Sequence, residues 1–510
     1  MREKIFNLLN LSDKVSKLKN QGKKIVHCHG VFDVLHLGHI QHFISAKKRG
    51  DVLVVTITPD TFVNKGPNRP VFPLKIRMQC VAALENVDFV AANNTADAMS
   101  AIKILKPDIY CKGKDYENKK SDITGKIISE EKTVKKLGGE IYYTQDDLLS
   151  SSEIINNSGF NLTTDQKKYL DNVRLNKKLN NKKKLNENIN SFSNLNVLVI
   201  GETILDEYVY CEALGKSGKD PVLVLRELFS ERYLGGALSI AKNLSSFCKK
   251  ISLLSYLGEK KEHENFITKN LEKNISTKFI YKKNSCTILK KRFLDNINKS
   301  KILGVHSIND EPFNKKQKAE FHKKLKNEIK KHDIVIVSDY GHGLISKDFA
   351  KKILSKRKFV AVNVQINSSN IGYHSLQNYK NANCIIINEN ELRYELRSKT
   401  EKIENLLKLL SKNLKLHFLV VTRGDSGAIL YDAKNNKFHY SDAFANKVID
   451  KVGAGDAMLA ILAICLYRKI NCDLTLMISS LCASQSVNSI GNKKAINKIT
   501  LLKELEHYLA

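Results

Sequence analysis

Two histidines separated by a leucine and a glycine form the first group of residues whose types and spacing could carry chemistry. His36 and His39 close the decapeptide Gly-Val-Phe-Asp-Val-Leu-His-Leu-Gly-His at residues 30–39. At the start of a helix this spacing puts both imidazoles on one face, and the backbone N–H groups of a helix N-terminus attract an anion. The motif therefore predicts a site for a triphosphate whose charge shifts during substitution at its α-phosphorus.

A glycine-rich turn that ends in an aspartate forms the second group. Residues 450–457 read Asp-Lys-Val-Gly-Ala-Gly-Asp-Ala and run into an apolar helix expected over 458–466. The turn at 453–455 can point successive N–H groups at one spot above the helix N-terminus, which makes an anion hole. Asp456 is placed to accept the proton of a sugar hydroxyl. Phosphorylating an alcohol benefits from such a base, whereas a phosphate acceptor is already anionic and needs none.

The elements around the histidines predict a parallel sheet with crossover helices. Short strands are expected at 24–28, 52–57, 89–91 and 108–111, and helices after residue 40 and over 76–84 and 96–105. Alternation of strands and helices favours parallel pairing. Ligands then collect at the carboxyl ends of the strands.

The elements around the aspartate predict a second α/β domain. It opens with a strand at 196–201, and its further strands are expected at 334–337, 359–362, 384–387 and 418–421. Between 208 and 233 the pattern is strand-like instead, which predicts a small antiparallel flap. We therefore expect three parts: a first α/β domain at 1–156, a basic Asn/Lys-rich linker at 157–195 and a second α/β domain at 196–510.

Composition sets the class of protein. Hydrophobic residues at 42% and charged residues at 27% are typical of a soluble globular chain. The ten cysteines show no metal-binding spacing, which favours reduced thiols in a cytosol. No signal-type run follows Met1, and the longest apolar stretch, 457–466, is too short to span a bilayer. A cytoplasmic location without membrane contact is expected.

The net charge of +31 invites a nucleic-acid hypothesis. The excess is spread thinly as lysine, without an aromatic-interleaved basic stripe and without tryptophan. We expect a solvated lysine-rich surface, small phosphorylated substrates as partners and no nucleic acid. A basic nucleic-acid-binding protein stays a third hypothesis, which predicts steep salt dependence of DNA or RNA affinity.

The first half resembles the nucleotidyltransferase superfamily with the His-x-Gly-His signature. Arg69-Pro70-Val71 with Pro73-Leu74 and Arg77-Met78, then Lys112–Tyr116 and the serine-rich 150–155, also resemble the adenylyltransferase half of the bifunctional heptose-phosphate kinase/heptose-1-phosphate adenylyltransferase family. The resemblance implies triphosphate contacts for His36 and His39, phosphate contacts for Lys65, Ser151 and Ser152, and nucleotide- or phosphate-binding roles for Gly30, Phe32, Asp33, Arg77 and Lys112. It leans towards ATP, although CTP stays open as the nucleotidyl donor.

Residues 196–510 resemble the ribokinase family of sugar kinases. The matching runs are Gly201 with Asp206, Gly235-Gly236-Ala237, Ser338–Gly341, Asn388–Glu391 and Thr422–Gly424. The resemblance implies that Asp206, Gly235 and Gly236 face the sugar, that Asn388, Glu391, Thr422, Gly424, Gly453, Ala454 and Gly455 bind nucleotide or phosphate, and that Glu391 lies near Mg²⁺. Asp456 would be the base.

Four positions depart from the family pattern: Ser239, His342, Gln365 and the pair Lys451-Val452. The order of the two domains is also reversed relative to the familiar fusion. The anion hole and the base remain, so an active kinase is expected with the identity of its sugar open.

The leading hypothesis is a bifunctional enzyme of nucleotide-sugar synthesis. One half would use ATP and Mg²⁺ to phosphorylate a sugar phosphate resembling a heptose 7-phosphate. The other would convert a sugar 1-phosphate into an ADP-sugar and pyrophosphate. The alternative is a nucleotidyltransferase, possibly CTP-using, with a silent kinase-like domain that senses sugar or dimerises. A homodimer through the flap is expected by analogy with this family.

Overall fold

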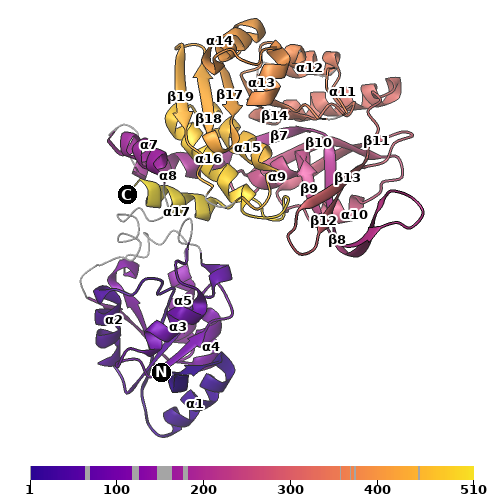
Figure 1. The fold of residues 1–510 in the computed structure, drawn as a ribbon. Helices are drawn as coiled ribbons and strands as arrows, with labels where there is room; N and C mark the ends of the chain where they lie inside the picture. Colours follow the sequence, from indigo (N-terminus) through magenta and orange to yellow (C-terminus); the bar gives the residue numbers. More distant parts are fainter. Residues whose placement is uncertain are drawn as a thin grey trace. The chain divides into compact units, whose positions relative to one another are not determined.

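The computed structural model describes residues 2–63, 69–117, 126–145, 163–175, 182–355, 358–367, 369–372, 375–445 and 448–509. The chain forms two compact units (Figure 1). The first comprises 1–163 with 502–510, and the second comprises 164–501.

A parallel sheet is the centre of the first unit. In spatial order its strands are β1 (Ile5–Phe6), β4 (Phe89–Ala92), β3 (Val52–Ile57), β2 (Ile25–Gly30), β5 (Ile109–Gly113) and β6 (Glu140–Thr144). Every neighbouring pair runs parallel. The β-branched and leucine-rich β3 is buried along its whole length, as expected for a parallel strand covered on both faces.

The helices of this unit cover both faces of the sheet. They are α1 (Leu8–Asn20), α2 (Leu37–Lys47), α3 (Leu74–Ala82), α4 (Met99–Leu105) and α5 (Lys126–Lys136). Phe43 of α2 and Val81 of α3 pack with Val55 in one apolar cluster, whereas Leu11 of α1 and Ala101 of α4 pack with Val54 in another. Consecutive residues of β3 thus serve opposite faces.

A larger sheet is the centre of the second unit. In spatial order its strands are β11 (Ile275–Lys282), β10 (Lys250–Gly258), β7 (Asn196–Gly201), β14 (Ile334–Asp339), β15 (Phe359–Val364), β16 (Cys384–Asn388), β17 (Phe418–Thr422), β18 (Ala428–Asp432) and β19 (Lys437–Ser441). The strands run parallel from β11 to β17. The last two join as antiparallel edge strands.

The expected flap is a separate four-stranded sheet. Its order is β13 (Lys301–Ser307), β12 (Ile288–Asp295), β8 (Thr203–Lys216) and β9 (Leu223–Gly236). β8 pairs antiparallel with β9, as predicted, and parallel with β12. The sequence prediction had found β8 and β9 but not the two strands that complete the sheet.

The remaining helices are α7 (Thr164–Leu175), α8 (Lys182–Ser191), α9 (Ala237–Leu244), α10 (Glu264–Lys269), α11 (Lys315–Ile329), α12 (Lys347–Leu354), α13 (Glu389–Leu396), α14 (Ile403–Leu414), α15 (Ala454–Tyr467), α16 (Cys472–Val487) and α17 (Lys498–Tyr508). In Figure 1, α11 to α14 lie on one side of the large sheet and α9, α15 and α16 lie on the other. Both sheets with their helices confirm the predicted α/β class.

Part of the segment expected to be a linker packs as structure. Within 157–195 lie α7 and α8, and Leu170 and Val173 of α7 are buried. Gln166 Nε2 donates a 2.6 Å hydrogen bond to the carbonyl oxygen of Ala443, so α7 is tied to the second unit. The domain boundaries themselves stay predictions. Within the described residues, no helix is both long and apolar enough to cross a lipid bilayer.

Candidate active sites

The first candidate site lies where β2 ends and α2 begins. His36 is the N-cap residue of α2 and His39 lies in its first turn. Their rings stack with centroids 3.9 Å apart and an interplanar angle of 28°. The structure therefore brings the two predicted imidazoles together at a helix N-terminus, where an anion is favoured.

Phe32 and Gly30 shape the turn below these imidazoles. Phe32 adopts a positive φ of 47°, and its ring contacts His39 edge-on with centroids 5.4 Å apart. A Cβ atom at Gly30 would lie 2.8 Å from Phe32 Cζ. Gly30 thus leaves room for the aromatic ring, which in turn supports His39.

Two more histidines lie under the site in β2. His27 Nε2 and His29 Nδ1 lie 2.8 Å and 2.9 Å from the hydroxyl oxygen of Thr56. Burial, with the positive charge of Lys112 nearby, lowers the pKa of His29 to about 3. Both rings are neutral near pH 7, since burial also lowers the pKa of His27. They hold β2 to β3 and bring no charge to the site.

Asp33 fixes the loop that leads into α3. Its carboxylate accepts hydrogen bonds from Val71 N at 2.8 Å and Phe72 N at 2.9 Å. Arg69 lies 3.5 Å from the same group, with both side chains almost fully buried. Asp33 therefore shapes the predicted nucleotide pocket through this loop.

Arg77 has a structural position. Its side chain is fully buried and donates to the carbonyl oxygens of Val31 at 2.5 Å, Thr58 at 2.9 Å and Phe72 at 2.9 Å. It also contacts Asp60 at 2.6 Å. Arg77 binds the protein's own backbone in this arrangement, so its predicted phosphate contact has no geometric support.

Lys112, at the end of β5, is held by an acidic partner. Its ammonium lies 3.2 Å from Glu130 Oε2. Burial alone would lower the pKa of Lys112, but Glu130, together with Tyr116 and Cys28, outweighs burial and raises it. Lys112 is therefore a fixed cation at the carboxyl end of the sheet. Lys65, Ser151 and Ser152, the other predicted phosphate ligands of this half, lie outside the described residues.

The second candidate site lies at the N-terminus of α15. Gly453 is the N-cap residue with φ 89°, and a Cβ atom there would lie 1.9 Å from Asn492 Oδ1. Only glycine fits that backbone and that space. Ala454 and Gly455 form the first turn, and a Cβ atom at Gly455 would meet nothing within 4 Å. The turn therefore presents its N–H groups beside open space.

Asp450 holds this turn from behind. Its carboxylate accepts from the hydroxyl of Tyr208 at 2.5 Å and pairs with Lys301 at 2.7 Å. It also accepts from Val452 N at 3.2 Å and Gly491 N at 3.1 Å. Tyr208 and Lys301 come from the flap, so flap and anion hole share one buried carboxylate.

Asp456 has the properties of a general base. Burial raises its pKa to about 7, and the nearby Asp206 carboxylate adds to the rise. The hydroxyl of Tyr340 donates to Asp456 Oδ1 at 2.7 Å and opposes that rise. A carboxylate with a pKa near neutrality accepts a proton far more readily than an exposed aspartate.

Asp206 belongs to a charged cluster on the flap. Arg292 forms an ion pair with it, and Lys290 lies directly opposite it in the pairing of β8 with β12. A Cβ atom at Gly235 would lie 2.3 Å from Asp206 Oδ2, so Gly235 makes room for the carboxylate. Gly236 has φ 57°, and a Cβ atom there would lie 2.6 Å from the carbonyl oxygen of Glu202.

Lys290, Arg292 and Tyr340 had no predicted role. The two cations stand two residues apart on β12 and share one face, yet an alternating basic strand is also typical of a solvent-facing surface. Burial, with Arg292 close by, lowers the pKa of Lys290 although Asp206 opposes the shift. Only the pairing of β12 with β8 reveals that these cations lie beside Asp206.

Glu202 and His342 close the rear of this site. Glu202 is fully buried, and its carboxylate accepts from Tyr340 N at 3.0 Å and His342 N at 3.2 Å. His342 Nδ1 lies 2.7 Å from Asp310 Oδ1. Burial and the charge of Lys290 lower the pKa of His342. The imidazole at this position, which departs from the family pattern, is therefore neutral near pH 7.

The predicted magnesium residue sits in a capping box. Asn388 N donates to Glu391 Oε2 at 2.8 Å, and Ile366 N donates to Oε1 at 3.1 Å. Burial raises the pKa of Glu391 to about 7. Each carboxylate oxygen keeps a lone pair for a cation or its water, so the residue fits a Mg²⁺ role.

Thr422 and Gly424 lie at the end of the neighbouring strand. Thr422 is the last residue of β17, and Gly424 follows with φ 57°. A Cβ atom at Gly424 would meet nothing within 4 Å, so this loop borders open space. The adjacent Arg423 is tied to Glu389 at 3.1 Å. These positions are compatible with the predicted nucleotide side.

Comparison with known proteins identifies both halves. The family described as pfkB family carbohydrate kinase matches residues 194–498. The family described as cytidylyltransferase-like matches residues 27–157. The Gly-Ala-Gly-Asp turn at 453–456 and the His-x-Gly-His motif at 36–39 each fall inside the matching region.

Curated relatives include the bifunctional protein HldE of Campylobacter jejuni strain RM1221, which is 26% identical over 299 residues, or 58% of this chain and 62% of the relative. HldE of Sulfurimonas denitrificans is 38% identical over 143 residues, or 25% of this chain and 30% of the relative. The chain thus spans less than two thirds of the first of these relatives. Phosphofructokinase-2 from Escherichia coli in complex with potassium has a TM-score of 0.50 at 14% identity, covering 62% of this chain and 99% of that structure, which shows the fold.

Proposed function

Because this chain belongs to the pfkB family of carbohydrate kinases and carries a cytidylyltransferase-like region before it, we propose that it is a bifunctional enzyme of nucleotide-sugar synthesis. The second domain phosphorylates a sugar phosphate, and the first converts a sugar 1-phosphate into a nucleotide sugar. The observation that carries the kinase half is the buried carboxylate of Asp456, with its pKa near 7, at the mouth of the glycine turn.

The kinase step follows from the order of these groups. Asp456 accepts the proton of the sugar hydroxyl as the oxygen attacks the γ-phosphorus of ATP, and the bond to the leaving ADP oxygen breaks. The N–H groups of Gly453–Gly455 receive the negative charge of the transferring phosphoryl group. Mg²⁺, when bound through Glu391, offsets charge on the phosphates. Thr422 and Gly424 line the nucleotide side.

A sugar that already carries a phosphate fits the flap. Lys290 and Arg292 both lie on β12, where Lys290 pairs with Asp206 of β8, and His306 lies opposite Lys290 in β13. Asp206 neutralises one of these charges, which leaves a cationic surface for a phosphate monoester. By resemblance this substrate is a heptose 7-phosphate phosphorylated at O1.

The transferase half needs no general base, only cationic and hydrogen-bond-donating groups that stabilise the phosphates. The sugar 1-phosphate attacks the α-phosphorus of the nucleoside triphosphate, and pyrophosphate leaves. His36 and His39 stabilise the developing charge from the N-terminus of α2, with Lys65, Ser151, Ser152 and Lys112 as further proposed phosphate contacts. ATP is the proposed donor, and CTP is the alternative that a donor screen separates from it.

A homodimer through the flap is the proposed assembly. Leu214 and Leu223 on β8 and β9, and Leu303 and Val305 on β13, are exposed by 46–55%. A second copy would cover this apolar surface. Light scattering of the wild type and of Leu303→Lys tests this: a dimer that becomes monomeric supports it, and a wild-type monomer contradicts it.

The function is tested by a product screen by mass. The purified chain is offered ATP or CTP with several sugar 1-phosphates, and ATP with several sugar phosphates including a heptose 7-phosphate. We expect a bisphosphate from the kinase and an ADP-sugar from the transferase. Formation of a nucleotide sugar without any sugar bisphosphate would instead favour a silent kinase-like domain.

A further inference from the structure

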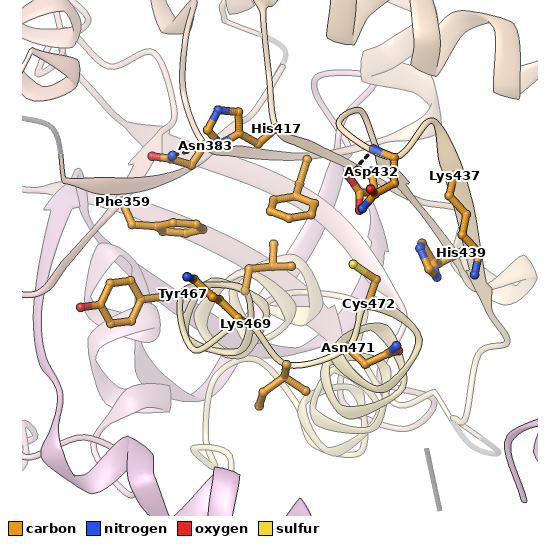
Figure 2. A pocket seen from close by; sticks show the side chains of 14 residues that line it. Phe359, Asn383, His417, Asp432, Lys437, His439, Tyr467, Lys469, Asn471 and Cys472 are labelled. Carbon is orange, nitrogen blue, oxygen red and sulfur yellow. Dashed lines mark hydrogen bonds between the residues drawn. The ribbon is translucent and has the colours of Figure 1, made fainter. Parts of the chain in front are cut away.

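A pocket lies at the antiparallel edge of the large sheet, away from the residues assigned to catalysis. Its volume is about 700 Å³. Figure 2 shows Phe359, Asn383 and Tyr467 on one side of it, and Asp432, His439 and Cys472 on the other. The first group is largely aromatic, whereas the second offers one oxygen, one nitrogen and one sulfur donor.

The three donors converge although they are distant in sequence. Asp432 ends β18, His439 lies in β19, and Cys472 begins α16. One ligand atom from each lies within 4.8 Å of the others. Asp432 and His439 are each only 6% exposed. Aspartate, histidine and cysteine are all side chains that bind Zn²⁺ in proteins.

A second carboxylate orients the histidine. His439 Nδ1 lies 2.6 Å from Asp473 Oδ1. With Nδ1 held by Asp473, Nε2 is the ring nitrogen left for a metal ion. Metal-bound histidines in proteins almost always donate the other ring N–H to a carboxylate, a backbone carbonyl or a water. Asn471, the N-cap of α16, accepts from Asp473 N at 2.8 Å and fixes the turn.

Asp432 is fixed with one acceptor direction to spare. Its Oδ1 accepts from Lys434 N at 3.1 Å and Asn435 N at 3.2 Å, and its Oδ2 accepts from Asn435 Nδ2 at 2.7 Å. A carboxylate offers about four lone-pair directions. Oδ2 therefore retains one, in a side chain whose rotamer is already set.

We propose that Asp432, His439 and Cys472 form a binding site for a divalent transition metal of the Zn²⁺ type. A mixed set of oxygen, nitrogen and sulfur donors suits Zn²⁺ and Co²⁺, whereas Mg²⁺ and Ca²⁺ require oxygen donors. Three protein ligands leave a fourth tetrahedral position, which a water molecule in the pocket takes. Cys472 loses its thiol proton to solvent on binding.

The metal would join the edge hairpin to a helix. Asp432 and His439 belong to the β18–β19 hairpin, which ends the sheet, and Cys472 belongs to α16, which packs on it. A bound ion would therefore restrain the two outermost strands against α16. Lys437 lies beside His439 in Figure 2, and its positive charge would repel the metal cation and lower the metal affinity of the site. This site does not depend on the proposed function.

Cobalt titration of the full-length chain tests the proposal. After treatment with a chelator, Co²⁺ should give a thiolate-to-cobalt charge-transfer band that saturates at one equivalent, and Zn²⁺ should abolish it. Cys472→Ser should lose the band. Cys80→Ser, which changes an exposed cysteine outside the cluster, should keep it. Absence of the band in the wild type, or its survival in Cys472→Ser, overturns the proposal.

A second variant separates ligation from folding. Asp473→Asn keeps all three ligands but weakens the carboxylate contact to His439, so Co²⁺ affinity should fall by about 10- to 100-fold. Circular dichroism and the melting temperature of the metal-free protein should match the wild type. Unchanged Co²⁺ affinity in this variant would contradict the proposed role of His439.

Discussion

The His36–His39 site and the Asp456 site share a position in their folds but differ in the charge of their reactive groups. Each lies at the carboxyl end of a parallel sheet, next to a helix N-terminus. In the first, two stacked imidazoles face a helix N-terminus and the buried histidines beneath them are neutral. In the second, a buried carboxylate has a pKa raised to about 7.

This difference matches the acceptor of each proposed reaction. A phosphate acceptor is anionic before it attacks, so the first site needs only donors for the developing charge. An alcohol acceptor must lose a proton, so the second site needs a base whose pKa suits neutral pH. The same fold class thus suits the two proposed phosphorus chemistries because burial acts on different residue types.

The largest expected effect comes from removing the base. Asp456→Asn should lower the rate of sugar phosphorylation by about 100- to 10,000-fold and leave nucleotidyl transfer unchanged. Separate assays of ADP formation and pyrophosphate release measure the two. Because each reaction serves as the control for the other, an unaltered phosphorylation rate would end the base assignment.

Removing an imidazole should break the opposite half. His39→Ala should lower kcat for nucleotidyl transfer by about 100- to 1,000-fold, since it removes a donor to the transition state. Sugar phosphorylation by the same variant should equal that of the wild type. A rise in KM alone, with kcat unchanged, would show that His39 serves substrate binding and not the transition state.

A smaller effect is expected at the flap. Lys290→Gln should raise KM for a phosphorylated sugar by about 10-fold, the value of one charge-assisted hydrogen bond. KM for the corresponding unphosphorylated sugar should stay unchanged. An equal rise in KM for both sugars would contradict phosphate recognition by Lys290.

The smallest effect is a shift in pH dependence. Asp456 acts as a base only when ionised, so kcat/KM of the kinase should rise with pH through about 7 and level off above it. The Tyr340 hydroxyl stabilises the ionised form and lowers that pKa. Tyr340→Phe should therefore move the rising limb to higher pH. An unmoved limb would separate Tyr340 from the base.

Local pattern was sufficient for the strongest apolar strands and for the two motifs. Strong apolar runs such as 52–57 and 384–387 are strands in the structure, as expected, because buried parallel strands need them. Helix α3 begins at Leu74 where 76 was expected, since Pro73 can occupy its N-cap. The strands β12 and β13 were missed because their basic residues hide the strand period.

The contacts of individual side chains were harder to predict from the sequence. The resemblance implies a nucleotide- or phosphate-binding role for Arg77, but its buried side chain donates to backbone carbonyls instead. The scattered cysteines read as unlinked thiols, yet Cys472 meets Asp432 and His439. In both cases the decisive partners lie elsewhere in the chain, where local spacing carries no information.

The sequence by itself predicted the two proposed chemistries, because a histidine pair and a glycine-framed aspartate lie in short stretches whose geometry is set by one turn and one helix start. Only the tertiary structure decided which residues serve them: the proximity of Lys290 and Arg292 to Asp206, the Tyr340 contact to Asp456 and the Asp432–His439–Cys472 cluster. Such contacts arise from strand order and burial, and these are properties of the whole folded domain.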